Sequence, residues 1–225
     1  MAGGETQLDG LTIKWIDHGT VQIRTPAGLV IYIDPFSQVL KGDEEPAGLI
    51  ISTHPHFDHF DPEAINRLSA QETEVVVKRG SEVGKLKASK VHQIDVGDEL
   101  TVKGVKLRAV HAYNERRFRA PGQPFHPKGF GIGVILELEG KKLYYAGDTD
   151  FIPEMRELQG EALDLAFLPI GGTYTMDAPE AAEAARAIKP RVVIPTHYNF
   201  LPETKANPEE LERGLEPAGI EVRIL

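Results

Sequence analysis

The stretch Thr53-His54-Pro55-His56-Phe57-Asp58-His59 is the most informative part of this sequence. It follows the apolar run 49–52, which is typical of a buried strand, and it precedes residues 62–69, where Asp61 is placed to cap a helix. The loop between the two therefore carries three imidazoles and one carboxylate, which are ligands that zinc and similar divalent ions take. The whole chain has 8 histidines, so three in one loop indicate a metal site rather than a polar surface loop.

The composition narrows the class of protein. The 225 residues are 41% hydrophobic and 26% charged, as in ordinary globular proteins. A net charge of −9 argues against a general nucleic-acid-binding protein, because phosphate contacts need a basic surface. Without cysteine, a metal must be held by His, Asp and Glu. The sequence begins without the features of a signal peptide and has no membrane-length apolar run, so we expect a cytoplasmic protein with no membrane partner.

Short apolar runs separated by turn residues predict many strands with interspersed helices. The expected strands cover 11–16, 21–25, 29–33, 49–52, 74–78, 91–94, 100–110, 131–138, 142–146, 163–168, 192–195 and 221–225. The expected helices cover 62–69, 81–86, 153–158, 178–188 and 208–215. Residues 1–10 are predicted to form a flexible tail, 112–129 a long loop, and 11–225 a single domain of layered α/β architecture.

His-x-His-x-Asp-His after a strand resembles the signature of the metallo-β-lactamase superfamily, and the likeness spans roughly residues 11–225. The resemblance implies a four-layer αβ/βα sandwich that binds one or two metal ions along its sheet edges. Further stretches are similar to a small cytoplasmic branch that includes ascorbate-phosphate lactonase-like proteins and many uncharacterised hydrolases. These stretches are 15–20, 33–36, 144–149, 168–172, 174–176 and 194–198.

The resemblance also implies how the ligands divide between two ions. One ion would be held by His54, His56 and His111, the other by Asp58, His59 and His197, and Asp148 would bridge them. His111, Asp148 and His197 each follow or end a predicted strand, where a sheet edge would present them. His126 stays open as an alternative third imidazole, or as a residue of the substrate pocket.

Other residues are expected around the ligands. Metal-bound imidazoles usually donate their second N–H to a carboxylate or carbonyl, and Asp34 is a candidate for that acceptor. His18 is a second candidate for a position just behind the ligands. Guanidinium groups bind phosphate or carboxylate at two points. The loop after His111 is therefore a candidate clamp for an anionic substrate, or else a solvated loop. Its cationic residues are Arg116, Arg117, Arg119 and Lys128.

The predicted activity is hydrolysis of a small ester, lactone or phosphodiester, anionic if the arginines bind it, by a metal-bound hydroxide. Asp58 and Asp148 are the expected catalytic carboxylates. Two divalent ions are expected, zinc first, while manganese, iron, cobalt and nickel also suit His and Asp ligands. The alternatives are a mononuclear-iron oxidoreductase on the same fold, a nuclease of the same superfamily, and a metal-free binding module. Neither the substrate nor the oligomeric state follows from the sequence.

Overall fold

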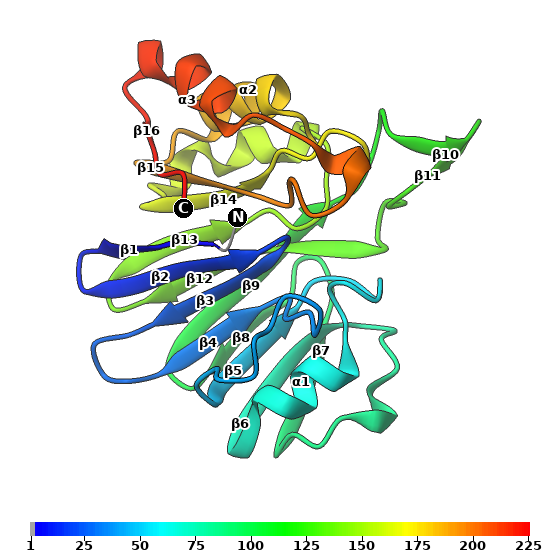
Figure 1. Ribbon diagram of the computed structural model, residues 1–225, viewed down its shortest axis with the longest axis vertical. Helices are drawn as coiled ribbons and strands as arrows, with labels where there is room; N and C mark the ends of the chain where they lie inside the picture. Colours follow the sequence, from blue (N-terminus) through cyan, green and yellow to red (C-terminus); the bar gives the residue numbers. More distant parts are fainter. Residues whose placement is uncertain (1–2) are drawn as a thin grey trace.

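The computed structural model describes residues 3–225, and two seven-stranded sheets form its centre (Figure 1). The first sheet contains, in spatial order, β1 (Glu5–Leu8), β2 (Leu11–Asp17), β3 (Thr20–Arg24), β4 (Val30–Ile33), β5 (Ala47–Ser52), β6 (Ser69–Lys78) and β7 (Lys90–Ile94). Strands β1 to β4 pair antiparallel, and β4 to β7 pair parallel. This sheet therefore uses the chain in sequence order from one edge to the other.

The second sheet repeats this division into an antiparallel and a parallel half. Its members are β8 (Glu99–Val102), β9 (Val105–Ala112), β12 (Gly131–Leu138), β13 (Lys141–Tyr145), β14 (Leu165–Pro169), β15 (Val192–Thr196) and β16 (Glu221–Val222). The spatial order is β16-β15-β14-β13-β12-β9-β8, with parallel pairing from β13 to β16. Residues such as Ile51, Val134 and Leu136 fill the core and have no exposed surface.

Helices cover the outer faces of the two sheets. Helix α1 (Pro62–Leu68) packs Ile65 and Leu68 on the first sheet in a small cluster of its own. The 3₁₀ helix η2 (Pro153–Glu161), α2 (Ala178–Ile188) and α3 (Pro208–Leu215) lie together over the second sheet, at the top of Figure 1. The predicted four-layer αβ/βα sandwich is therefore confirmed.

Local sequence signals explain where helices α1 and α2, both of which were predicted, begin. The carboxylate of Asp61 accepts hydrogen bonds from the backbone N–H groups of Glu63 and Ala64, and Asp177 accepts one from Glu180. Such caps satisfy backbone donors that a helix leaves free at its start, at about 1 kcal/mol each. Three short 3₁₀ turns, η1 (Val83–Lys85), η3 (Pro202–Thr204) and η4 (Glu216–Ala218), complete the helical elements of the described chain. Among residues 3–225, no helix has the length and apolar character needed to cross a bilayer.

The structure corrects several predicted boundaries. Residues 5–8 of the expected tail form β1, which pairs with β2, while residues 1–2 lie outside the described chain. The expected strand 100–110 is the hairpin β8–β9, because Lys103 and Gly104 turn the chain with positive φ angles of 52° and 81°. The expected loop 112–129 contains the hairpin β10 (Phe118–Ala120) and β11 (Gln123–Pro124), which projects from the body in Figure 1. At the end of the chain the strand covers two residues, Glu221–Val222, rather than 221–225.

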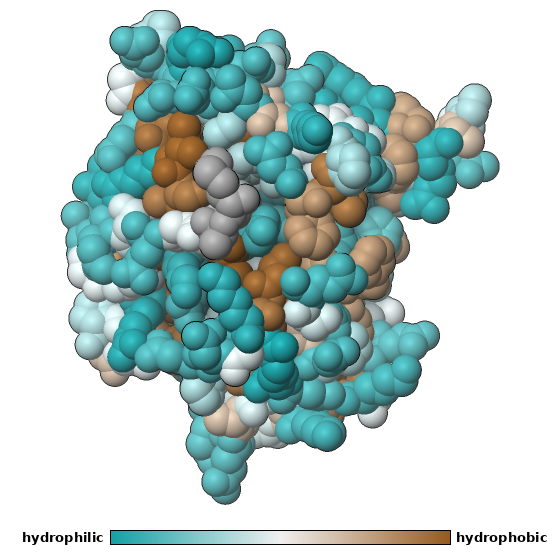
Figure 2. All heavy atoms as spheres, in the orientation of Figure 1, coloured by the Kyte–Doolittle hydropathy of each residue, from teal (hydrophilic) through white to brown (hydrophobic). Residues whose placement is uncertain are grey.

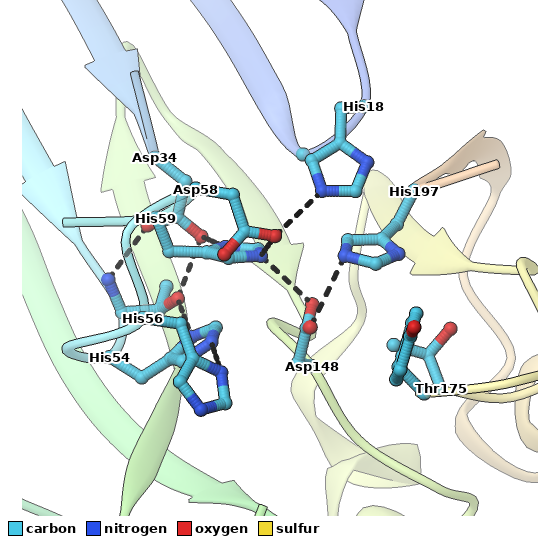
Figure 3. Close-up of polar contacts among 12 residues, drawn as sticks. His18, Asp34, His54, His56, Asp58, His59, Asp148, Thr175 and His197 are labelled. Carbon is cyan, nitrogen blue, oxygen red and sulfur yellow. Dashed lines mark hydrogen bonds and ion pairs between the residues drawn. The ribbon is translucent and has the colours of Figure 1, made fainter. Parts of the chain in front are cut away.

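The parallel halves bring polar residues to one edge of the sandwich. The carboxyl ends of parallel strands meet at such an edge, which is where α/β sheets usually bind ligands. Residues that follow these strand ends are Asp34 after β4, the loop 53–59 after β5, Asp148 after β13 and His197 after β15. His18, in the β2–β3 turn, lies beside them (Figure 3).

Candidate metal centre

Three imidazoles form the first group of metal-ligating side chains. Nδ1 of His56 lies 3.1 Å from Nε2 of His54 and 3.2 Å from Nε2 of His126. A neutral imidazole has one N–H and one lone pair. Three ring nitrogens that face one another cannot all be paired by mutual hydrogen bonds, whereas a cation between them would accept all three lone pairs.

The second group contains Asp58, His59 and His197, with His18 beside them. Their ligand atoms all lie within 4.8 Å of one another. Nε2 of His59 and Nε2 of His197 are buried and make no hydrogen bond. Buried polar atoms without a partner are rare in folded proteins, so each needs an explanation. Convergence of such nitrogens on a carboxylate is the arrangement expected of metal ligands.

Asp148 connects the two groups. Its Oδ1 lies 3.4 Å from Nε2 of His59, and its Oδ2 lies 3.3 Å from Nε2 of His126 and 3.2 Å from Nε2 of His197. Figure 3 shows this carboxylate pointing toward the imidazoles from the loop after β13. Because its Oδ2 faces a nitrogen of each group, Asp148 lies between the two groups.

The structure does not bring His111 to either group. His111 lies on β9 opposite Ile132, its ring is 6.1 Å from that of Tyr113, and it lines a separate cavity beneath η2. The position predicted for it is taken by His126, the alternative. His126 reaches this position because the β10–β11 hairpin turns the chain back on itself. The backbone N–H of Asn114 then donates to the carbonyl oxygen of His126 at 2.8 Å. A strand end alone therefore does not determine which histidine faces the metal.

The ligand rings are held in orientation by a layer of hydrogen bonds. Asp34, with no exposed surface, accepts from Nδ1 of His59 at 2.7 Å and from the backbone N–H and hydroxyl of Thr53, also at 2.7 Å. Nε2 of His18 lies 2.9 Å from Oδ2 of Asp58. Asp34 makes the contact predicted for it, and His18 contacts a candidate ligand carboxylate rather than an imidazole. An imidazole tied through one nitrogen presents the other in a fixed direction.

Backbone strain is concentrated at the same residues. His18, Asp34 and His197 have φ angles of 49°, 47° and 56°, in the left-handed region that residues other than glycine seldom adopt. Each costs about 1–3 kcal/mol and persists only where its surroundings impose it. The backbone N–H of His197 donates to the carbonyl oxygen of His18 at 2.7 Å, which ties two strained positions together. Strain of this kind is typical of functional sites.

The protonation states of His54, His126 and Asp148 suit metal binding. Burial lowers the pKa of His18 and of His126 to about 4, and it holds the pKa of His54 well below its usual range, so these rings are neutral near pH 7. Burial alone would raise the pKa of Asp148, but the nearby His197 and His59 lower it well below its usual value. Neutral imidazoles and an ionised carboxylate are the forms that coordinate a divalent ion.

His59 experiences the excess of negative charge most directly. Burial opposes a charged ring, but Asp148, Asp34 and Asp58 outweigh it and raise the pKa of His59 well above its usual value. Three carboxylates around one buried imidazole favour a positive charge at this position. The donor set and its charge therefore both fit divalent cations.

A cavity of about 420 Å³ opens over the cluster. Its floor includes the metal-ligating residues His56, Asp58, His126, Asp148 and His197. Its remaining lining consists of Phe57, Arg119, Phe125, Tyr174 and Leu201. This volume suits a small organic substrate.

Of the four predicted cationic residues, the structure brings one to this cavity. Arg119 lines it. Arg117 is half-buried and pairs instead with Asp150 and Glu180, and Nζ of Lys128 pairs with Glu154 at 2.6 Å. Arg116 is exposed and lies 3.7 Å from Glu180. The predicted clamp is therefore reduced to a single arginine, because nearby acids hold or attract the others.

Asn114 and Asp150 are parts of the site that the sequence reasoning missed. Oδ1 of Asn114 lies 2.8 Å from Nδ1 of His126, and Nδ2 of Asn114 donates to Asp150 at 3.0 Å. Asp150 has no exposed surface and accepts the backbone N–H groups of Glu115 and Arg116 as well. The only signal in the sequence was a second aspartate two residues after Asp148. Its role depends on a loop whose path no local pattern reveals.

The structure predicts different effects for alanine substitutions at His126 and at His111. We expect His126→Ala to lose about one metal ion per chain and most activity, because it removes one of three imidazoles in the first group. His111→Ala should keep metal content and activity, since its ring lies elsewhere. Elemental analysis and turnover of the two variants, measured side by side, check this. Metal loss in His111→Ala with full retention in His126→Ala would contradict it.

The chain is similar in sequence and in fold to several known proteins. A family model described as a beta-lactamase superfamily domain matches residues 12–197. A UPF0173 metal-dependent hydrolase from Rubrobacter xylanophilus is 34% identical, over 98% of this chain and 95% of its own length. The crystal structure of a protein from Parabacteroides distasonis, assigned as a metal-dependent hydrolase, is 34% identical with a TM-score of 0.83, covering 99% of this chain and 97% of that one. A metallo hydrolase from Ignicoccus hospitalis is 26% identical with a TM-score of 0.75, covering 96% and 94%.

Proposed function

Since this chain belongs to the metallo-β-lactamase superfamily, among the UPF0173 metal-dependent hydrolases, we propose that it hydrolyses a small ester, lactone or phosphodiester with a centre of two divalent ions. The observation that carries the proposal is the convergence of two ligand groups, joined by Asp148, on the floor of one substrate-sized cavity. A small molecule rather than a polymer is the expected partner, because the cavity is of limited volume.

The proposed ligands of the first ion are His54, His56 and His126, those of the second are Asp58, His59 and His197, and Asp148 serves both. When bound, such ions would supply a Lewis acid and an activated water near neutral pH. Zinc is the first choice for this set of imidazole and carboxylate ligands, and manganese, iron, cobalt and nickel also suit it.

The chain's own residues prepare this chemistry. Asp34 accepts a hydrogen bond from the Nδ1–H of His59, so that Nε2 presents its lone pair toward Asp58 and Asp148. Oδ1 of Asn114 accepts the corresponding hydrogen bond from the Nδ1–H of His126. The His18 ring approaches Asp58 and fixes the direction of its carboxylate. Loss of such supporting contacts typically costs 10–100-fold in metal affinity or activity.

A nuclease is a weaker interpretation of the same centre. Binding to a polyphosphate backbone needs several cationic groups around the site. Among the described residues that line the cavity, Arg119 is the only arginine or lysine. The net charge of −9 opposes a nucleic-acid substrate as well.

The test is a comparison of metal-free and metal-loaded protein on a panel of esters, lactones and phosphodiesters. We expect hydrolysis after loading with zinc or manganese, and loss of it on chelation, because the activation of water near neutral pH depends on the bound ions. Readdition of metal should restore it. Oxygen consumption by the iron-loaded protein, without hydrolysis of any panel member, would overturn the proposal in favour of an oxidoreductase.

A further inference from the structure

We infer that the substrate is an amphipathic anion, with an apolar, preferably aromatic body against the cavity wall and an anionic group bound by Arg119. The inference rests on the proposed function, because it concerns the same cavity. It narrows that function from small hydrolysable molecules in general to those that carry a negative charge away from the bond that breaks.

The wall of the cavity is aromatic. Phe57 lies in the metal-binding loop and is 70% exposed, the largest exposure of a large apolar side chain in the described chain. Phe125 and Tyr174 meet edge to face with ring centroids 4.8 Å apart. Figure 2 shows apolar side chains at the surface beside the β10–β11 hairpin. Exposed apolar groups that gather around a cavity indicate a binding surface for an apolar ligand.

Arg119 differs from Arg117 in having its charge unpaired among residues 3–225. Among residues 3–225, no carboxylate forms an ion pair with it, whereas Arg117 has three such partners. Its Nη2 donates to the carbonyl oxygen of Phe125 at 3.2 Å, and its guanidinium carbon lies 5.8 Å from the Phe125 ring. The remaining N–H groups are free to bind a carboxylate or a phosphate.

The contact with Phe125 joins the charged and the apolar parts of the wall. A guanidinium beside an aromatic ring is held in place without losing its charge. A ligand that packs on Phe125 therefore brings its anionic group within reach of Arg119, while its reacting bond faces the floor with His56 and Asp148. A cationic ligand of the same shape would be repelled by the arginine.

The experiment uses the metal-loaded full chain and two ligands of one shape, 2-naphthylacetate and 2-naphthylacetamide. Calorimetry gives the affinity ratio of the anionic to the neutral ligand. Metal ions contribute to this ratio equally in parent and variant, so the comparison isolates Arg119. We expect Arg119→Gln to reduce the ratio about 10-fold, as the loss of one charge-assisted contact implies. The exposed control Arg116→Gln should leave the ratio unchanged.

The apolar part is tested with the same two ligands. Phe57→Ala should weaken both by a similar factor, about 5-fold, because it removes contact area and no charge. An unchanged ratio in Arg119→Gln would overturn the anionic part of the inference, and unchanged affinities in Phe57→Ala would overturn the apolar part.

Turnover separates this inference from the proposed function. If the ratio depends on Arg119 but no panel substrate is hydrolysed, the proposed function fails while the binding preference stands. Arg119→Gln could instead change the efficiency of hydrolysis equally for neutral and for anionic aryl esters. The proposed hydrolase activity would then stand, and the inferred preference for anionic substrates would be overturned.

Discussion

Asp148→Ala is expected to lower kcat/KM at least about 10³-fold and to reduce the metal content of the protein. The carboxylate of Asp148 is the contact shared by His59, His126 and His197, so its removal disturbs both ligand groups together. Metal ions contribute several kcal/mol to the stabilisation of a hydrolytic transition state, and each 1.36 kcal/mol is tenfold in rate. Steady-state kinetics on the best panel substrate, with elemental analysis, measures both effects.

The fold should survive this substitution, because Asp148 follows β13 and its side chain faces the cavity rather than the hydrophobic core. Circular dichroism that matches the parent would show this. Asp43→Ala is the matched control, because Asp43 is exposed and distant in sequence from Asp148, and this variant should keep full turnover. Parent-like turnover of a folded Asp148→Ala variant would remove this residue from the catalytic centre.

Arg117→Gln is expected to destabilise the protein by about 3–5 kcal/mol, because it leaves buried acids without their counter-charge. Nη1 of Arg117 lies 2.8 Å from Asp150, contacts Glu180 as well, and its Nε donates to the carbonyl oxygen of Gly172 at 2.7 Å. Asp150 has no exposed surface and Glu180 is 6% exposed, so water cannot replace the lost contacts. Burial alone would lower the pKa of Arg117, but Glu180 and Asp150 raise it.

For a chain of this size, such a loss corresponds to a fall in Tm of roughly 10 °C. Thermal unfolding of Arg117→Gln beside Arg116→Gln measures it. Arg116 is exposed and 3.7 Å from Glu180, so its replacement should change stability by less than about 1 kcal/mol. Equal Tm values for the two variants would show that the contacts of Arg117 with Asp150 and Glu180 do not stabilise the protein. Asp150 also accepts a hydrogen bond from the side chain of Asn114, so Arg117→Gln should weaken metal binding at His126.

The fold was predictable because its signals are local. Turn residues and caps such as Asp61 and Asp177 set the element limits, and the motif 53–59 indicated both the superfamily and the site. One error arose where a short turn interrupts an apolar pattern. Lys103 and Gly104 split the expected strand 100–110 into a hairpin, since two residues suffice to reverse an antiparallel chain.

The site was less predictable where long-range contacts decide. His111 and His126 are both histidines near the end of an element, and no sequence pattern shows which one the hairpin places over His54 and His56. The position of His126 depends on Asn114, whose side chain binds it across a loop. Likewise, three arginines within four residues look equivalent in sequence. In the structure Arg117 forms ion pairs with Asp150 and Glu180, whereas Arg119 donates to a backbone carbonyl oxygen.

The metal content of the purified full chain tests the two-ion centre most directly. Elemental analysis before and after reconstitution with zinc or manganese should approach two ions per chain, with His126→Ala retaining about one. A parent protein that never exceeds one ion per chain under saturating metal would contradict a centre in which Asp148 serves two ions.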